Sequence, residues 1–254
     1  MFPIRDDNPT LHTSVATFLI IIANIATWIF IQGLGFNPAL ARSICRFGLI
    51  SGELLGRIEP GTQIPLGRGM ACVISSDPNW LTIFTSMFMH GGWLHLIGNM
   101  WFLAVFGDNV EDVMGSIRFV VFYLLCGMGA VAVQMVSDPG SAAPMIGASG
   151  AIGGVMGAYA ILFPRAPVHM LVFFGFFFTR IVVPAFLMLG YWFILQFLGG
   201  FFSLGNPSGV AFWAHIGGFV TGIVLINFFC KSDRLQACKN KRGRTEKIVR
   251  RIYR

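Results

Sequence analysis

The chain has 254 residues, of which 55% are hydrophobic and only 11% are charged, and its mean hydropathy is +0.72. Soluble domains carry about a quarter charged residues, so this composition excludes an ordinary soluble protein and indicates a chain that crosses a membrane several times. The formal net charge of +7 comes mostly from residues 231–254. We interpret this basic tail as a topology anchor on anionic lipid headgroups and not as a nucleic-acid-binding surface.

Apolar segments follow a polar stretch at residues 1–14, which we expect to be loosely ordered. A membrane-spanning helix needs roughly 20 apolar residues, and four of the segments reach or nearly reach that length. The other two are shorter and rich in glycine. The six segments are residues 15–34, 92–106, 117–136, 149–163, 181–198 and 210–229. The sequence therefore predicts an all-α, polytopic membrane protein, a bundle of six transmembrane helices.

Basic residues set the expected orientation of this domain, residues 15–230. The tail 231–254 holds ten Lys or Arg residues, which predicts that it lies in the cytoplasm. Six spans then place residues 1–14 on the same side and the long loop 35–79 outside. The compact size and the lack of a transit peptide favour the inner membrane of a bacterium.

Two connecting segments carry further expectations. The loop 35–79 contains apolar stretches, and we expect short helices resting on the outer leaflet. Its two cysteines, Cys45 and Cys72, could pair in an oxidising compartment. Residues 168–178 are apolar but too short to span, so we interpret them as an interfacial segment that leads into the fifth helix.

Polar side chains within or beside the apolar segments are few, and each is costly enough in a membrane to suggest a function. They are Asn24, His90, His95, Asn99, Ser149, Gln196 and His215. A structural role, hydrogen bonding between helices, is enough to explain Asn24 and Gln196. A structural role in holding the preceding loop is sufficient for His90.

Three of these polar residues are expected at one depth. Ser149 and His215 each lie 14 residues before the inner end of their helix, which is about 21 Å above the inner surface at 1.5 Å per residue. In a hydrocarbon core about 30 Å thick, both then lie roughly 9 Å below the outer surface. His95 comes to a similar level, so the three side chains would share a site open to the outside.

Small residues accompany both Ser149 and His215 along their helices. Ser149 is followed by glycines at positions 153 and 157, and His215 by glycines at 218 and 222. Such stripes let membrane helices approach closely, which would bring the hydroxyl and the imidazole within hydrogen-bonding reach. A serine paired with a neutral imidazole is an activated nucleophile. The alternative to a catalytic pair is that the glycines serve helix packing alone and that the two polar residues have no joint function.

His95 and Asn99 are four residues apart and share a helix face. Their side chains, with backbone N–H groups at the start of residues 149–163, could stabilise an oxyanion beside the nucleophile. A metal site is disfavoured because no Asp, Glu or Cys lies at this level to complete a set of histidine ligands. The sequence predicts no metal and no cofactor.

Four motifs in order resemble the rhomboid family of intramembrane serine proteases. They are "HLIGN" at 95–99, "GDNVEDVMG" at 107–115, "GASG" at 147–150 and "AHIGGFVTG" at 214–222. The resemblance covers residues 13–230. It implies a Ser149–His215 dyad without a third carboxylate, an oxyanion hole formed by His95, Asn99 and the Ser149 amide, and an acyl-enzyme intermediate. The implied substrates are single-span membrane proteins, cleaved in or near the outer part of their helix.

The resemblance also implies a lateral gate formed by the fifth span and the loop 199–208. Two departures from the family stand out. Some members carry an aromatic residue under the histidine ring where this chain has Gly153, so His215 is expected to be oriented by backbone packing or by another side chain, such as Tyr191 or Trp192. Some members also have a Trp-Arg pair in the first loop, which residues 35–79 lack.

Three alternatives belong to other classes. A non-catalytic relative that binds membrane helices typically lacks the serine or the histidine, and this chain keeps both. A transporter predicts inverted repeats and charged groups at the midplane, and neither is visible. A metalloprotease needs an H-E-x-x-H arrangement, which is absent from the sequence.

Overall fold

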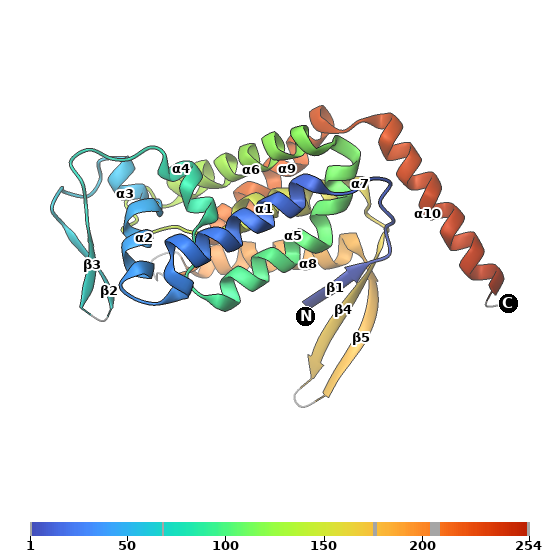
Figure 1. The fold of residues 1–254 in the computed structure, drawn as a ribbon, viewed down its shortest axis with the longest axis horizontal. Coiled ribbons are helices and arrows are strands. Elements are labelled where there is room, and N and C mark those ends of the chain that lie inside the picture. Colours follow the sequence, from blue (N-terminus) through green and yellow to red (C-terminus); the bar gives the residue numbers. More distant parts are fainter. Residues whose placement is uncertain (1, 68, 175–176, 204–208, 253–254) are drawn as a thin grey trace.

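A bundle of helices forms the centre of the molecule in the computed structural model, which describes residues 2–67, 69–174, 177–203 and 209–252. The long helices run side by side along one axis (Figure 1). They are α1 (Val15–Ala26, continued by a π-helical turn, Thr27–Ile31), α5 (Trp93–Met114), α6 (Ser116–Ser137), α7 (Ser149–Leu162), α8 (Ala185–Phe202) and α9 (Phe212–Phe229). The helical core matches the expectation from the apolar segments.

Three helices among the described residues, α6, α8 and α9, are long and apolar enough to cross a membrane. The helix of α1 with its π-turn and helix α7 are apolar but shorter. Helix α5 has 22 residues, and its last two turns carry Asp108, Glu111 and Asp112. A membrane-embedded helical protein is therefore evident, and the count of six spans stays a prediction.

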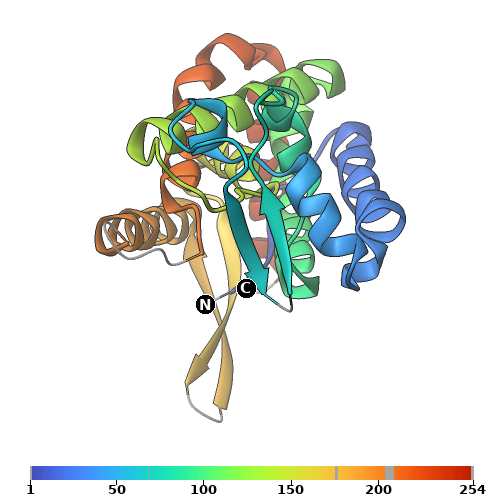
Figure 2. The same cartoon turned by 90° about the vertical axis from the view of Figure 1, so that its left-hand side faces the viewer.

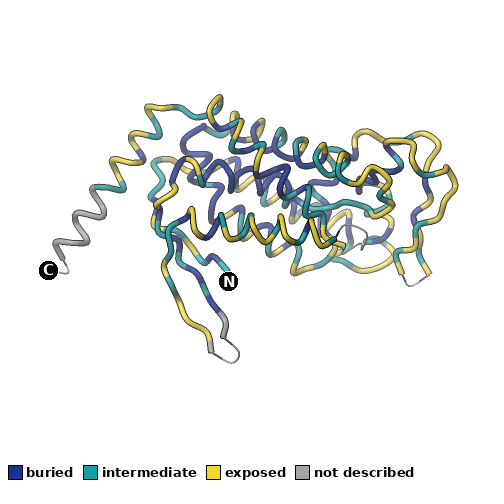
Figure 3. The backbone as a smooth tube through the Cα atoms, turned by 180° about the vertical axis from the view of Figure 1, so that it is seen from behind, coloured by how far each residue is buried: buried dark blue, intermediate teal, exposed yellow. Residues whose placement is uncertain are grey.

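Helix α7 lies at the centre, in contact with α5, α6 and α9, and burial is concentrated there (Figure 3). Helices α7 and α9 pack backbone against backbone. A Cβ atom added to Gly218 would lie 1.8 Å from the Gly150 carbonyl oxygen, and one on Gly222 would lie 2.0 Å from that of Gly154. The expected close approach of the two helices is present, but the glycines of α7 that meet Gly218 and Gly222 are Gly150 and Gly154; the expected Gly153 and Gly157 instead meet the backbone of His215 and Phe219. Only residues without a side chain allow this separation.

Two small sheets show that the prediction of an all-α fold was too narrow. Strands β1 (Phe2–Asp6), β4 (Pro167–Phe174) and β5 (Phe177–Pro184) form one antiparallel sheet in the order β1-β4-β5. The segment 1–14, expected to be loose, thus contains a strand. Of the expected interfacial segment 168–178, residues 168–174 belong to β4 and residues 177–178 to β5, and residues 175–176 lie outside the described part of the chain. Val, Ile and Phe favour extended backbone, and β1 supplies the partner that a local pattern cannot reveal. Helix α8 consequently begins at Ala185, after Pro184.

The loop 35–79 folds as short helices, as expected, and adds a β-hairpin. It contains helices α2 (Ala39–Phe47) and α3 (Ser51–Leu54) and strands β2 (Gln63–Gly67) and β3 (Met70–Val73). A 3₁₀ turn, Gly33–Gly35, leads into the loop. After the loop come the short helix α4 (Thr82–Thr85) and a second 3₁₀ turn, Ser86–Phe88. Figure 2 shows the hairpin at this end of the bundle, with α1 and α8 on opposite sides. A disulfide joins Cys45 to Cys72, so the pairing left open by the sequence is present.

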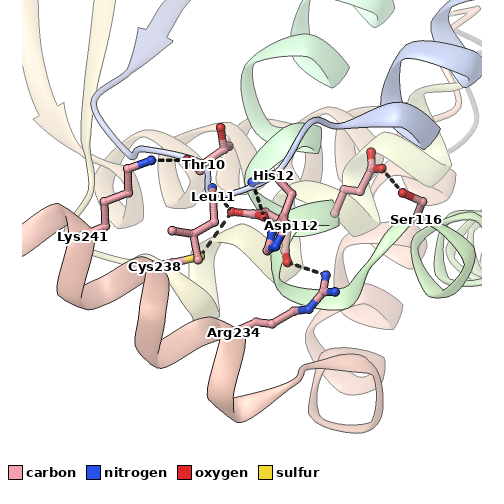
Figure 4. A network of polar contacts seen from close by, with 9 residues as sticks. Thr10, Leu11, His12, Asp112, Ser116, Arg234, Cys238 and Lys241 are labelled. Carbon is pink, nitrogen blue, oxygen red and sulfur yellow. Dashed lines mark hydrogen bonds and ion pairs between the residues drawn. The ribbon is translucent and has the colours of Figure 1, made fainter.

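The opposite end of the bundle is held by two neighbouring carboxylates of α5. Glu111 accepts hydrogen bonds from the first N–H groups of α1, at Ala16 (2.8 Å) and Thr17 (2.7 Å). Asp112 accepts the N–H groups of Leu11 (2.6 Å) and His12 (3.1 Å). It also contacts the Cys238 thiol of α10 (Ser232–Ile252) at 3.4 Å, so one carboxylate ties the N-terminal segment to the basic tail (Figure 4).

Candidate active site

Ser149 is the first residue of α7, and the backbone just before it is shaped by Gly147. Gly147 has φ +126°, a conformation that other residues rarely adopt, and its N–H donates to the Ser86 carbonyl (2.9 Å). A Cβ atom at Gly147 would lie 2.7 Å from His95 Nε2 and 3.5 Å from Ser149 Oγ. The glycine therefore keeps open the space between the hydroxyl and the His95 ring.

His215 lies in the first turn of α9, and its Nε2 is 2.8 Å from Ser149 Oγ. The backbone approach of α7 and α9 creates this contact, since a Cβ atom on Gly153 would lie 3.0 Å from the His215 carbonyl oxygen. The hydroxyl and imidazole predicted to meet are thus in hydrogen-bonding distance. This distance is the one that proton transfer from a serine nucleophile to a histidine base requires.

The other side of the His215 ring faces α8. Its Nδ1 lies 2.8 Å from Gln196 Oε1, and the Trp192 ring is tilted by 37° against it at 5.9 Å between centroids. Trp192 was one of the two side chains expected to orient His215, whereas Tyr191 is exposed. Sequence reasoning missed the role of Gln196 as the ring's partner. The available signal was its spacing, because Trp192 and Gln196 are four residues apart and share a helix face.

His95 and Asn99 lie on α5, one turn apart. His95 Nδ1 accepts the Gly91 N–H at 3.3 Å, so in a neutral ring Nε2 carries the proton and is a donor directed toward Gly147. The Asn99 amide donates to the His95 carbonyl at 2.8 Å, within its own helix. Among the described residues, no hydrogen bond joins Asn99 to Ser149. His95 is therefore placed beside Ser149, and the Asn99 amide is engaged within its own helix.

His90 precedes α5 and is fully buried, with its ring against that of His95 at 5.1 Å between centroids. Its backbone is held by Gln32, whose side chain accepts the His90 N–H at 2.8 Å and donates to the His90 carbonyl at 2.7 Å. The position agrees with the structural role that the sequence suggests for His90. Within the described part of the chain, no group of three or more His, Cys, Asp or Glu residues could hold a metal ion.

A cavity of about 570 Å³ lies at this end of the bundle, between the ends of α6, α8 and α9 and the start of α5. Polar groups from His95 and Asp138 line it together with the apolar Trp213. A second cavity of about 20 Å³ reaches Ser149 and shares Ile146 and Ala211 with the first. The candidate nucleophile therefore lies next to a space large enough for an extended peptide segment.

Comparison with known proteins points in the same direction. The family model described as the Rhomboid domain matches residues 77–232. "Rhomboid-like protein 11, chloroplastic" of Arabidopsis thaliana is 30% identical over 154 residues, 59% of this chain and 52% of that protein. "Rhomboid protease GluP" of Bacillus subtilis (strain 168) is 33% identical over 172 residues, 62% of this chain and 32% of that protein.

A third relative, "RHOMBOID-like protein 7" of Arabidopsis thaliana, is 26% identical over 216 residues, 82% of this chain and 63% of that protein. The chain spans about half the length, or less, of several of the curated relatives that it matches. Ser149 and His215 both fall within residues 77–232, as do Gln196, His95 and Asn99.

Proposed function

The chain belongs to the rhomboid family, and from this premise we propose that it is a serine endopeptidase that cleaves single-span membrane proteins in or near the outer part of their transmembrane helix. The observation that carries the proposal is the 2.8 Å contact between Ser149 Oγ and His215 Nε2 beside a cavity. The family also contains proteins described only as rhomboid-like, so membership alone does not imply catalysis. The support for a protease activity must come from the residues of the site itself.

In the first half of the reaction, Ser149 Oγ attacks the carbonyl carbon of the scissile peptide bond while His215 Nε2 takes the hydroxyl proton. The negative charge that develops on the carbonyl oxygen is stabilised by N–H groups of the first turn of α7, which have no partner within the helix. The His95 Nε2–H is a second donor on the same side. His215 then gives its proton to the leaving amine, and the acyl-enzyme remains.

In the second half, water attacks the acyl carbon while His215 Nε2 takes a proton from that water. His215 then gives this proton to Ser149 Oγ as the bond to the acyl group breaks and the acid product leaves. Asn99 contributes to the oxyanion hole only after its amide leaves the His95 carbonyl that it binds here. The residues in these roles are Ser149 as nucleophile, His215 as base and acid, and His95 and Asn99 as oxyanion donors. No metal or cofactor enters any step.

We place the active site near the outer membrane surface, with residues 1–14 and the basic tail in the cytoplasm. The polar lining of the larger cavity supports access of water to this end of the bundle, which the second half-reaction needs, and the basic tail is the basis for the orientation. The relatives come from a plant and a bacterium, among other sources, so the bacterial inner membrane rests on the sequence argument alone. The bilayer and transmembrane substrates are the proposed partners.

The experiment that tests the proposal compares cleavage of a model single-span substrate in liposomes by wild type, Ser149→Ala and His215→Ala. Because nucleophile and base act as a unit, we expect each substitution to lower kcat by about 10⁴-fold or more. A fluorophosphonate probe should label the wild type and fail to label Ser149→Ala. Undiminished cleavage by Ser149→Ala contradicts the mechanism.

A matched control is Ser116→Ala. Ser116 lies at the start of α6, whose other end reaches the cavity at Ser137, so about 30 Å of helix separates it from the site. It donates a hydrogen bond to Glu111 (2.6 Å), and we expect labelling and cleavage to survive its loss. If folded wild type neither cleaves nor reacts with the probe, the alternative of a non-catalytic, helix-binding protein is favoured.

A further inference from the structure

We propose that Gln196 is a positioning residue that sets the proton arrangement of the dyad from helix α8. Its side-chain oxygen accepts the proton on His215 Nδ1, which leaves Nε2 free to accept the proton of Ser149. The inference rests on the proposed function and assigns to the site a third member, supplied by an amide where many serine hydrolases use a carboxylate.

The orientation of the Gln196 amide follows from its two contacts. Oε1 lies 2.8 Å from His215 Nδ1, and Nε2 lies 3.4 Å from the carbonyl oxygen of Trp192. A carbonyl oxygen only accepts, so the NH₂ end of the amide belongs on the Trp192 side. Turning the amide over would place two acceptors together at Trp192. The oxygen therefore faces the imidazole.

The orientation of the amide decides the tautomer of His215. An amide oxygen has lone pairs and no proton, so Nδ1 must be the protonated nitrogen of the neutral ring. Nε2 then carries the lone pair, and it is Nε2 that lies 2.8 Å from Ser149 Oγ. The opposite tautomer would present an N–H to the hydroxyl and could not accept its proton.

The Trp192 and Gln196 side chains hold the ring by different means. Trp192 packs against the ring at a tilt of 37° and limits its movement, but this ring contact makes no hydrogen bond that distinguishes Nδ1 from Nε2. The ring of Phe212 lies edge-on at 6.5 Å between centroids and is equally indifferent to protonation. Among the described residues, Gln196 is the side chain in hydrogen-bonding contact with Nδ1. The tautomer of the base thus depends on one residue of α8.

The first experiment measures cleavage kinetics of Gln196→Leu and Gln196→Glu in liposomes. Leucine keeps the bulk and removes the acceptor, so we expect kcat to fall by roughly 10-fold to 100-fold, with KM unchanged within about twofold. Glutamate keeps an oxygen at the same reach, and we expect it to restore kcat to within roughly threefold of wild type. A Gln196→Leu enzyme with wild-type kcat overturns the inference.

The second experiment reads the tautomer directly from ¹⁵N chemical shifts of the His215 ring, assigned by difference with His215→Ala. We expect Nδ1 to be protonated in wild type and in Gln196→Glu, and the Nε2-protonated form to gain population in Gln196→Leu. This readout does not need turnover. Failure of the proposed function, with no cleavage by folded wild type, is therefore distinguishable from failure of the inference.

The matched control is Gln134→Leu. Gln134 also accepts a hydrogen bond from α9, from the backbone N–H of Ala214 at 3.2 Å, but it does not contact the His215 ring. We expect its loss to leave the ¹⁵N shifts of His215 unchanged. Equal changes in His215 for both glutamine variants would show a general loosening of α9 and contradict a specific role for Gln196.

Discussion

The candidate site lies between two kinds of helix contact: α7 packs closely against α9, and α8 packs against α9 more loosely. Helices α7 and α9 touch through their backbones, with glycines on both sides of the contact. Helix α8 touches α9 through large side chains, such as Phe193 against Phe219 at 4.9 Å, and leaves much of its own surface exposed. Ser149 and His215 therefore lie on a backbone contact that tolerates no added atom, whereas Gln196 lies on a helix held by side-chain packing.

This difference assigns separate tasks to the two regions. The distance between the backbones of Ser149 and His215 is fixed by the close packing of α7 against α9, which leaves no room for an added atom at the glycines of the contact. The orientation of the His215 ring depends on α8, which side-chain repacking could displace without disturbing that distance. If Gln196 has the proposed role, a change confined to α8 is expected to alter the tautomer of His215 and to leave the packing of α7 against α9 unchanged.

The largest expected effect tests the backbone contact. In Gly218→Ala, the new methyl group would start 1.8 Å from the Gly150 carbonyl oxygen, so the two helices must separate. We expect the free energy of unfolding to fall by more than about 3 kcal/mol, with loss of fluorophosphonate labelling. Thermal unfolding in detergent micelles measures the first and probe labelling the second.

Gly190→Ala on α8 is the matched control. A Cβ atom there has no neighbour within 4 Å, and alanine favours helix over glycine, so we expect stability to stay equal or to rise by about 0.5 kcal/mol. Equal destabilisation by the two substitutions would show that the contrast between the regions is wrong.

An intermediate effect concerns local opening. Backbone amides in the middle of α8 should exchange with deuterium about 100-fold faster than those in the middle of α7, a difference of about 2.7 kcal/mol in opening free energy, because fewer buried contacts must be broken. Hydrogen exchange of the protein in nanodiscs, read by mass spectrometry, measures this. Slower exchange in α8 than in α7 would reverse the assignment of rigid and adjustable parts.

The smallest effect lies at the other end of the bundle, where Asp6 of β1 contacts the hydroxyl group of Tyr159 on α7. Burial raises the pKa of Asp6 from 3.8 to about 6. A carboxyl group whose pKa is higher in the folded state favours folding when protonated, so the stability it contributes is complete below about pH 4 and is lost as the pH rises through 6. The contribution of this end of the molecule to the free energy of unfolding therefore depends on pH.

We expect the folded state to lose roughly 1 to 2 kcal/mol between pH 4 and pH 7.5 from this group, after an allowance for solvent screening. Asp6→Asn should abolish that part of the dependence. Unfolding curves of both proteins at several pH values give the comparison. An Asp6→Asn protein with the wild-type pH dependence would assign the titration to another residue.

Much of the helical core could be predicted from the sequence because a membrane span leaves a local signal of about 20 apolar residues. The sheet β1-β4-β5 could not. Its hairpin is as apolar as an interfacial segment, and the partner of Leu171 is Phe2, a pairing that no local pattern reveals. The pairing of Cys45 with Cys72 stayed open for the same reason, since two cysteines in one loop do not show how the loop folds.

The geometry of the site was predictable where it depends on helix faces. The glycine periodicity near Ser149 and His215 predicts the close approach of their helices, but it selects Gly153 and Gly157 on α7 where Gly150 and Gly154 meet Gly218 and Gly222. Gln196 was assigned only a general hydrogen bond between helices, because a glutamine in an apolar helix gives the same pattern whether it binds a backbone or a catalytic ring. Choosing between these requires the rotation of α8 about its axis, which the sequence does not specify.

The pairing of β1 with β4 also has a consequence for biosynthesis. Phe2 is made 169 residues before its partner Leu171. At a translation rate of about 5 to 20 residues per second, the N-terminal strand waits roughly 8 to 34 s with its edge unpaired, while several helices are inserted before it. During that interval a chaperone or another nascent chain has access to an open strand edge. The ribosome therefore imposes an order of assembly in which residues 2–6 are made long before their partner strand exists.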